Sequence, residues 1–225
     1  EGFACYNLPP AEGASIWMQY MTAYYPVVEL SKAAPGRVFL ITAATSTAGT
    51  AALEIGRLHG ATMIGTTRYD YNRAYLEEAG ADHVIVTGDS NEGLADRLLE
   101  LTDGRGIDAA YDAIGHGLMP EYVGALAKNS RIYFYGMLDG GFPEIPYAAL
   151  FQSNALFQAY SVFNYLEDED MCARGIAWMN KALEAGDVSP AIDRVYPMLE
   201  YPDACRYMRG PRKAHGKVVV ETGIT

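Results

Sequence analysis

The sequence predicts a doubly wound α/β fold around a parallel sheet, followed by part of a second domain. Short apolar runs, which are typical of buried strands, alternate with helical segments of about ten residues between positions 38 and 165. The first run, residues 38–41, is followed by a turn of small residues and then by an amphipathic helix that begins at Gly49. Right-handed crossovers between parallel strands place helices on both faces of such a sheet.

The expected elements are separated by clear turn and capping signals. Residues 11–30 are predicted to form a helix that Pro26 interrupts late, and Pro35-Gly36 separates this helix from the first strand. The predicted helix at 70–79 has Asp70 as its expected N-cap and Gly80 as its stop. The other expected elements are strands at 62–66, 83–86, 107–111, 131–135 and 156–161, and helices at 93–101 and 118–127.

Residues 166–225 follow a different pattern. A long helix at 168–186 precedes two short apolar strands, 192–195 and 217–221, with a helix at 202–208 between them. Two short strands are not stable alone, so they are expected to join a sheet that residues 1–30 hardly supply. We therefore expect a linker helix region (1–34) from a second domain, a parallel-sheet domain (35–165), and a C-terminal helix with a segment that returns to the second domain (166–225).

Composition and charge limit the possible partners. The 225 residues are 50% apolar and 20% charged, which is ordinary for a globular protein, and the formal net charge is −11. Such a charge argues against nucleic acid and anionic membranes as partners. No apolar run reaches bilayer length and no signal peptide is visible. Cys5, Cys172 and Cys205 lack metal-ligand spacing and are odd in number, which favours reduced thiols and therefore a cytoplasmic location.

The turn after the first strand is the main candidate binding site. A strand, a tight turn and a helix N-terminus together present free backbone N–H groups and the positive end of a helix dipole to a phosphate. Gly49 keeps the position that needs close helix–strand approach in a Rossmann dinucleotide-binding fold, although other glycines of that pattern are replaced. A plain turn without a ligand is the alternative. The predicted pyrophosphate contacts are Ala43, Thr45, Ser46, Thr47, Ala48 and Gly49.

The end of the second strand indicates which dinucleotide is bound. A site that prefers NAD places a carboxylate there to hold the ribose 2′-hydroxyl. The sequence instead has Thr67 and Arg68, and an arginine can bind a 2′-phosphate with two hydrogen bonds. Arg73 is a candidate second phosphate contact, and Tyr69 is a candidate for packing on the adenine. The cofactor predicted from this segment is NADP(H), with a solvated arginine as the alternative role of Arg68.

Four blocks of sequence carry a resemblance to a known family through their order and spacing: residues 35–49, 78–85, 104–115 and 214–220. They resemble the medium-chain dehydrogenase/reductase superfamily, in particular its zinc-independent quinone-oxidoreductase-like and enoyl-reductase-like branch. The resemblance implies that the family's N-terminal GroES-like catalytic domain is missing here. It also implies a homodimer formed by pairing edge strands, for which 131–135 and 156–161 are candidates. Further cofactor contacts that match family positions are Thr22, Ala113, Ile114, Gly136 and Met137.

The resemblance implies an NADPH-dependent oxidoreductase that transfers hydride to a quinone or to an activated C=C or C=O bond of a small molecule. The cofactor carries this chemistry, so no catalytic motif needs to be visible. Tyr20, Tyr24 and Tyr135 are the tyrosines expected near the cleft, and scattered histidines disfavour zinc. On its own, the chain is expected to bind NADPH but to turn over poorly. A non-catalytic nucleotide-binding module, a fragment of a zinc-type alcohol dehydrogenase and a methyltransferase-like fold are the alternatives.

Overall fold

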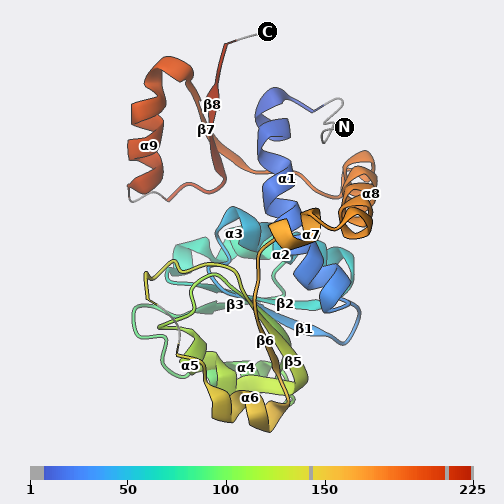
Figure 1. Ribbon diagram of the computed structural model, residues 1–225. Helices are drawn as coiled ribbons and strands as arrows, with labels where there is room; N and C mark the ends of the chain where they lie inside the picture. Colours follow the sequence, from blue (N-terminus) through green and yellow to red (C-terminus); the bar gives the residue numbers. More distant parts are fainter. Residues whose placement is uncertain (1–7, 142–143, 211–212, 224–225) are drawn as a thin grey trace.

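A six-stranded parallel sheet forms the centre of the protein in the computed structural model, which describes residues 8–141, 144–210 and 213–223 (Figure 1). The strand order is β3-β2-β1-β4-β5-β6. The chain builds the sheet outward from β1 to β3 and then crosses back to place β4 on the other side of β1, so the strand order reverses between β1 and β4. This confirms the predicted doubly wound α/β fold. The strands are β1 (Val38–Ile41), β2 (Thr62–Thr67), β3 (His83–Val86), β4 (Ile107–Asp112), β5 (Leu126–Phe134) and β6 (Leu156–Ala159).

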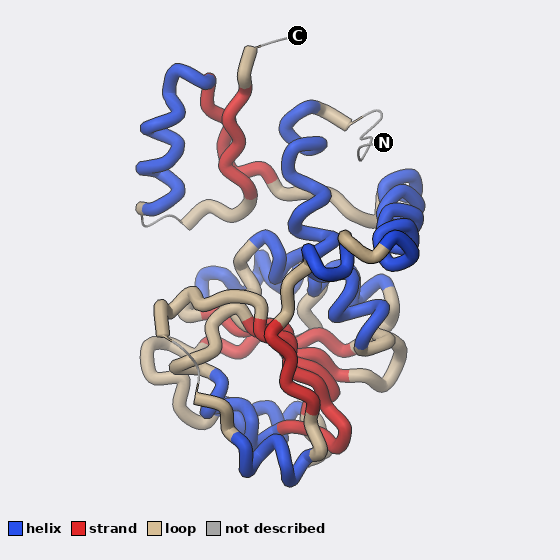
Figure 2. Tube along the Cα trace, in the orientation of Figure 1, coloured by secondary structure: helices blue, strands red, loops and turns tan. Residues whose placement is uncertain are grey.

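Helices cover both faces of the sheet, as the tube view also shows (Figure 2). Side chains alternate between the faces along a strand, so Phe39 and Ile41 join one core while Val38 and Leu40 join the other. The first core is covered by α1 (Pro10–Tyr24), α2 (Thr47–Leu58), α3 (Arg73–Glu78) and α8 (Glu169–Ala185). The second is covered by α4 (Leu94–Leu101), α5 (Met119–Tyr122) and α6 (Tyr147–Ser153).

Several predicted elements differ in detail from the structure, including the strand predicted at 131–135, which begins at Leu126. The predicted helix at 118–127 is wrong in its second half: α5 passes into a 3₁₀ turn, Val123–Ala125, and β5 already begins at Leu126. The predicted helix at 11–30 continues beyond α1 as a π-helical segment, Tyr25–Leu30, that contains Pro26. Asp70 is not an N-cap, because it lies inside the 3₁₀ turn Asp70–Asn72 and its carboxylate instead accepts from Arg73 Nε at 3.0 Å.

A second, two-stranded sheet stands apart from the first (Figure 1). It consists of β7 (Ile192–Pro197) and β8 (Lys217–Glu221), which are parallel and are connected through a 3₁₀ turn, Met198–Glu200, and α9 (Tyr201–Arg209). Within the described part of the chain, no third strand joins them. The short helix α7 (Phe163–Leu166) leads from β6 towards α8. Among the described residues, no helix combines the length and the apolar character that crossing a bilayer requires.

Candidate functional site

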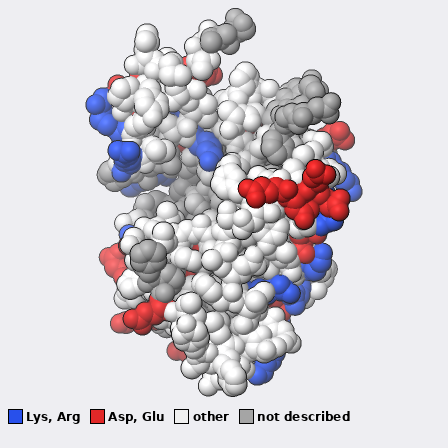
Figure 3. Space-filling model, in the orientation of Figure 1, with Lys and Arg blue, Asp and Glu red and all other residues white. Residues whose placement is uncertain are grey.

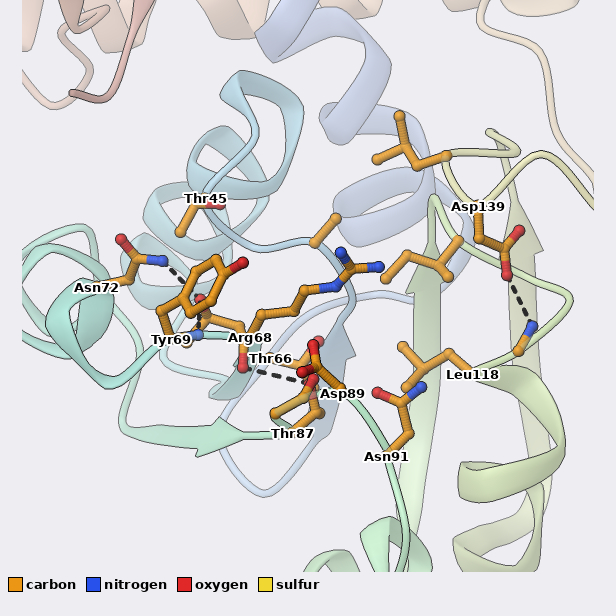
Figure 4. A pocket seen from close by; sticks show the side chains of 16 residues that line it. Thr45, Thr66, Arg68, Tyr69, Asn72, Thr87, Asp89, Asn91, Leu118 and Asp139 are labelled. Carbon is orange, nitrogen blue, oxygen red and sulfur yellow. Dashed lines mark hydrogen bonds between the residues drawn. The ribbon is translucent and has the colours of Figure 1, made fainter. Parts of the chain in front are cut away.

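A cavity of about 340 Å³ opens at the carboxyl ends of β1, β2, β3 and β4 (Figure 4). Ligands of open α/β sheets bind at this edge, where the strand order reverses. The cavity includes Thr67 and Arg68 from the end of β2 and Ile114 from the loop after β4. The other residues that line it are Ala43, Thr45, Thr66, Tyr69, Asn72, Thr87, Gly88, Asp89, Asn91, Gly117, Leu118, Leu138 and Asp139.

A second cavity, of about 570 Å³, continues from the first along the turn before α2. Ala43, Thr45, Tyr69, Asn72 and Leu138 line both cavities, so the two form one groove. Its far side is formed by Tyr71, Met208 and residues 214–218, which include His215 and Lys217.

The turn before α2 is built to approach a ligand closely. Ser46 caps α2, because its Oγ accepts a hydrogen bond from the Gly49 N–H at 3.1 Å. The backbone N–H groups of Thr47 and Ala48 have no acceptor among the described residues, so they are available at the positive end of the helix. A Cβ on Gly49 would lie 2.7 Å from the Ala44 carbonyl oxygen, which explains why glycine stands there. Ala43 takes a left-handed backbone conformation, with φ of 45°.

The end of β2 brings two candidate residues together. The Arg68 side chain extends across the cavity towards the side formed by Leu118 and Asp139 (Figure 4). No hydrogen bond or ion pair joins its guanidinium to another described residue. Thr67 is 93% buried and its Oγ1 accepts from Asn72 Nδ2 at 2.8 Å. Tyr69 stacks on Tyr71, with ring centroids 5.2 Å apart.

Other predicted site residues lie outside the groove lining. Arg73 is held elsewhere, because its guanidinium donates to Asp70 and, at 2.9 Å, to the carbonyl oxygen of Val84. The Thr22 hydroxyl donates to the Met18 carbonyl within α1. Five further predicted contacts line neither cavity: Ala48, Gly49, Ala113, Gly136 and Met137. Ala113 directly precedes Ile114, which does line the first cavity. The structure therefore gathers Ala43, Thr45, Ser46, Thr47, Thr67, Arg68 and Ile114.

The loop after β4 is held by a buried carboxylate. Asp112 Oδ1 accepts from the Thr42 hydroxyl at 2.7 Å and from the backbone N–H groups of Ile114 and Gly115 at 2.9 and 3.1 Å. Its Oδ2 accepts from the Tyr122 hydroxyl at 2.8 Å. Gly136 passes beside this loop, where a Cβ would lie 3.0 Å from the Ala113 carbonyl oxygen. Asp112 therefore fixes the position of Ile114 in the cavity wall.

Two of the tyrosines expected near a cleft, Tyr20 and Tyr24, donate their hydroxyls to carboxylates within the fold. The Tyr20 hydroxyl donates to Glu54 and the Tyr24 hydroxyl donates to Glu29. Burial raises the pKa of Tyr135 far above its ordinary value. Tyr135 also stacks on Tyr111, with ring centroids 3.9 Å apart. No three His, Cys, Asp or Glu side chains of the described residues are grouped to hold a metal ion, and Cys5 lies outside those residues.

Sequence reasoning missed several lining residues. Thr87, Asp89 and Asn91 directly follow β3, and the general position of ligands at carboxyl ends of parallel strands could have indicated them. Leu138 and Asp139 lie in a long connection after β5, where no local pattern shows which residues turn inward. Asn72 was missed because a turn residue near a helix start is usually assigned to capping.

Comparison with known proteins gives a consistent result. A 2-haloacrylate reductase from Burkholderia sp is 27% identical over 209 residues, which cover 92% of this chain and 62% of that protein. A quinone oxidoreductase-like protein 2 homolog from Nematostella vectensis is 29% identical over 149 residues, covering 66% of this chain and 40% of that protein. The chain thus spans less than two thirds of the length of these relatives.

Solved structures show the same fold. The crystal structure of a 2-haloacrylate reductase superposes with a TM-score of 0.88 at 25% identity, over 97% of this chain and 67% of that one. A mycobacterial protein solved in complex with NADPH superposes with a TM-score of 0.86 at 22% identity, over 96% of this chain and 67% of that one. A family model described as zinc-binding dehydrogenase matches residues 48–180, more than half of the chain. The chain therefore belongs to the zinc-binding dehydrogenase family of the medium-chain dehydrogenase/reductase superfamily.

Proposed function

We propose that this chain is the NADP(H)-binding part of an oxidoreductase that transfers hydride to a quinone or to an activated C=C or C=O bond. The observation that carries the proposal is the Arg68 guanidinium, which has no partner among the described residues and extends into the cavity at the end of β2. No carboxylate competes for this place at the end of β2, where an NAD-preferring site would have one. The free amides of Thr47 and Ala48 supply the matching pyrophosphate contacts.

The chain's own contribution to the reaction is binding and orientation. NADPH, when bound, supplies the hydride. The Thr47 amide in the groove lining would hold the diphosphate, with the free Ala48 amide next to it in the chain, while Arg68 would pair with the 2′-phosphate and anchor the adenosine end. Lys217 lies on the far side of the groove, and burial lowers the pKa of its ammonium group.

The substrate is proposed to be a small molecule held partly by the remainder of the parent protein. The chain spans 62% of the Burkholderia reductase, and the two-stranded β7–β8 sheet gains no further strand within the described residues. Two such strands are marginal alone, so a partner sheet supplied by that remainder would stabilise them. A zinc-independent mechanism is part of this proposal, because the four histidines are scattered along the sequence and none is paired with a cysteine at metal-ligand spacing.

We also propose a cytoplasmic homodimer. The edge strand β6 carries no charged residue, and Leu156 at its start is 49% exposed. Tyr147 and Phe151 of the adjoining α6 are exposed too, and they line a shallow apolar groove. Figure 3 shows mostly uncharged atoms over the region of α6. An uncharged edge strand beside exposed aromatic side chains favours pairing with a second copy. The free thiols of Cys172 and Cys205 agree with a reducing compartment.

The cofactor proposal is tested by titrating the chain with NADPH and NADH while following the fluorescence of Trp17 and Trp178. NADPH is expected to bind more tightly. Arg68→Ala should weaken NADPH binding by about 2 kcal/mol, or roughly 30-fold, because a charge-assisted hydrogen-bond pair is lost. The affinity for NADH should hardly change.

Arg209→Ala, which removes an exposed guanidinium from α9, is the matched control and should leave both affinities unchanged. Tighter binding of NADH by the unaltered chain, or an Arg68→Ala protein with full NADPH affinity, would contradict the proposal.

A further inference from the structure

Asn72 lies at the junction of the two cavities. It is the last residue of the 3₁₀ turn after β2, and it lines both cavities. Its residue surface is 5% exposed. A buried amide at the centre of a ligand groove needs hydrogen-bond partners, because leaving its polar atoms unpaired costs free energy.

The amide has one partner, and that partner is Thr67. Asn72 Nδ2 donates to Thr67 Oγ1 at 2.8 Å, and the dashed line in Figure 4 marks this bond. The backbone N–H of Tyr69 approaches the same oxygen at 3.4 Å. Asn72 Oδ1, by contrast, is buried without a hydrogen-bond partner among the described residues. The amide is therefore oriented with its donor side towards Thr67.

This arrangement determines what the Thr67 hydroxyl offers to a ligand. A hydroxyl has one hydrogen to donate and two lone pairs to accept with. Two N–H groups already approach the oxygen, and within the described residues no acceptor takes its hydrogen. Towards the cavity, Thr67 therefore acts as a donor. The neighbouring residue, Arg68, likewise presents donors that have no partner.

Two adjacent donors, one of them charged, match a group that only accepts. A phosphate monoester carries up to two negative charges and accepts through three oxygens, so both bonds to it are charge-assisted. A ribose hydroxyl in the same place carries no charge and gains less from each bond.

We propose that Asn72 is a positioning residue for cofactor specificity. By donating to Thr67 Oγ1, it makes the Thr67 hydroxyl a donor that acts with Arg68 to select the 2′-phosphate of NADPH over the 2′-hydroxyl of NADH. The inference rests on the proposed function, and it assigns to Asn72 an effect on selectivity that is exerted through Thr67.

The test uses two probes that differ only by the phosphate, adenosine 2′,5′-bisphosphate and 5′-AMP, with calorimetric titration of the whole chain. The measured quantity is the ratio of the two dissociation constants. Asn72→Ala and Thr67→Val are each expected to lower this selectivity about tenfold, because one hydrogen bond to a charged group is lost or misdirected. The double variant should be no less selective than Thr67→Val alone, since both changes remove the same donor.

Matched controls separate this effect from general damage. Thr67→Ser keeps the hydroxyl and should keep the selectivity, while Asn180→Ala removes an exposed amide from α8 and should change neither constant. A structural role for Asn72 would weaken both probes alike and leave their ratio intact. That result, or additive losses in the double variant, would overturn the proposal.

Asn72→Asp provides a second route if Asn72→Ala does not fold. A carboxylate of the same size accepts the Thr67 hydrogen instead of donating to its oxygen, so Asn72→Asp should lower the selectivity. When Thr67→Val is already present, adding Asn72→Asp should lower the selectivity by less than it does in the unaltered chain. Unchanged selectivity in Asn72→Asp would overturn the inference. If the unaltered chain prefers the bisphosphate but the Asn72 variants keep that preference, only this inference fails. If the unaltered chain binds neither probe, the proposed function fails as well.

Discussion

At the scale of single residues, Asp112 shows how one buried side chain can shape a binding loop. It follows the apolar residues of β4 and is completely buried, yet four donors surround it: two hydroxyls and two backbone amides. Because every donor has the same carboxylate as its acceptor, the loop, β1 and α5 are held to one another. Asp112 lies at the carboxyl end of a parallel strand, where ligands bind in such sheets, but its hydrogen bonds give it a supporting role.

Replacing Asp112 should therefore destabilise the whole domain. Asp112→Ala leaves buried donors on Thr42, Ile114, Gly115 and Tyr122 without an acceptor, and we expect a loss of about 3–5 kcal/mol in the free energy of unfolding. Urea denaturation followed by circular dichroism measures this loss. Asp112→Asn keeps one acceptor oxygen and should lose less. Equal stability of Asp112→Ala and the unaltered chain would show that the network contributes little.

At the scale of secondary-structure elements, the contact between α1 and α2 contains a buried acid. The Tyr20 hydroxyl on α1 donates to Glu54 on α2, and Arg57 and Tyr75 are the other titratable groups that act on this pair. Burial raises the pKa of Glu54 to about 7, against the smaller opposing effects of the Tyr20 hydrogen bond and of Arg57. The α1–α2 contact therefore favours the protonated form of the Glu54 carboxyl.

This shift predicts how stability depends on pH. The folded chain keeps the Glu54 proton up to about pH 7, while the unfolded chain loses it near the ordinary pKa of 4.5. Stability therefore falls as pH rises through this window, by up to roughly 3 kcal/mol from this group. Glu54→Gln should remove that loss when unfolding free energies at pH 5 and pH 8 are compared. Glu77→Gln, at an exposed position on α3, is the control, and an unchanged pH dependence in Glu54→Gln would refute the assignment.

At the scale of the whole molecule, two features point to contacts beyond this chain. The first is the two-stranded β7–β8 sheet beside α1, which has exposed apolar residues in and after β7, among them Leu199 at 95% exposure. The second is the β6 edge of the large sheet, with Phe151 of α6 exposed at 89% beside it. They belong to different sheets, so they can be tested independently.

The dimer proposal is tested at β6. Leu156→Lys places a charge on the edge strand and should shift the chain from dimer to monomer, because a charged edge opposes pairing between strands. Sedimentation velocity measures the shift. NADPH affinity should not change, since Leu156 does not line the cofactor groove. Leu199→Lys is the control in the other sheet, and the proposal is wrong if that variant dissociates the dimer while Leu156→Lys does not.

Much of the architecture could be predicted because it depends on local patterns. The apolar runs at Val38–Ile41 and His83–Val86 form strands with the predicted bounds. The start of β5 was missed since Lys128 and Asn129 are exposed and Asn129 has a φ of 60°, which no strand pattern indicates. Arg68 and Arg73 look alike in the sequence, but Asp70 and the Val84 carbonyl hold Arg73, leaving Arg68 for the cavity.

The alternation of apolar strands with amphipathic helices already specifies the fold class, and the strand–turn–helix at Ser46 already indicates the proposed phosphate site, because both depend on neighbours close in the chain. The roles of Asn72, Asp112 and Glu54 were decided in three dimensions. Each depends on burial or on a partner brought close by folding, Asp112 through Thr42 and Glu54 through Tyr20 across long stretches of chain. Whether a polar side chain binds a ligand or supports the fold depends on which donors and acceptors surround it, and those come from separate elements.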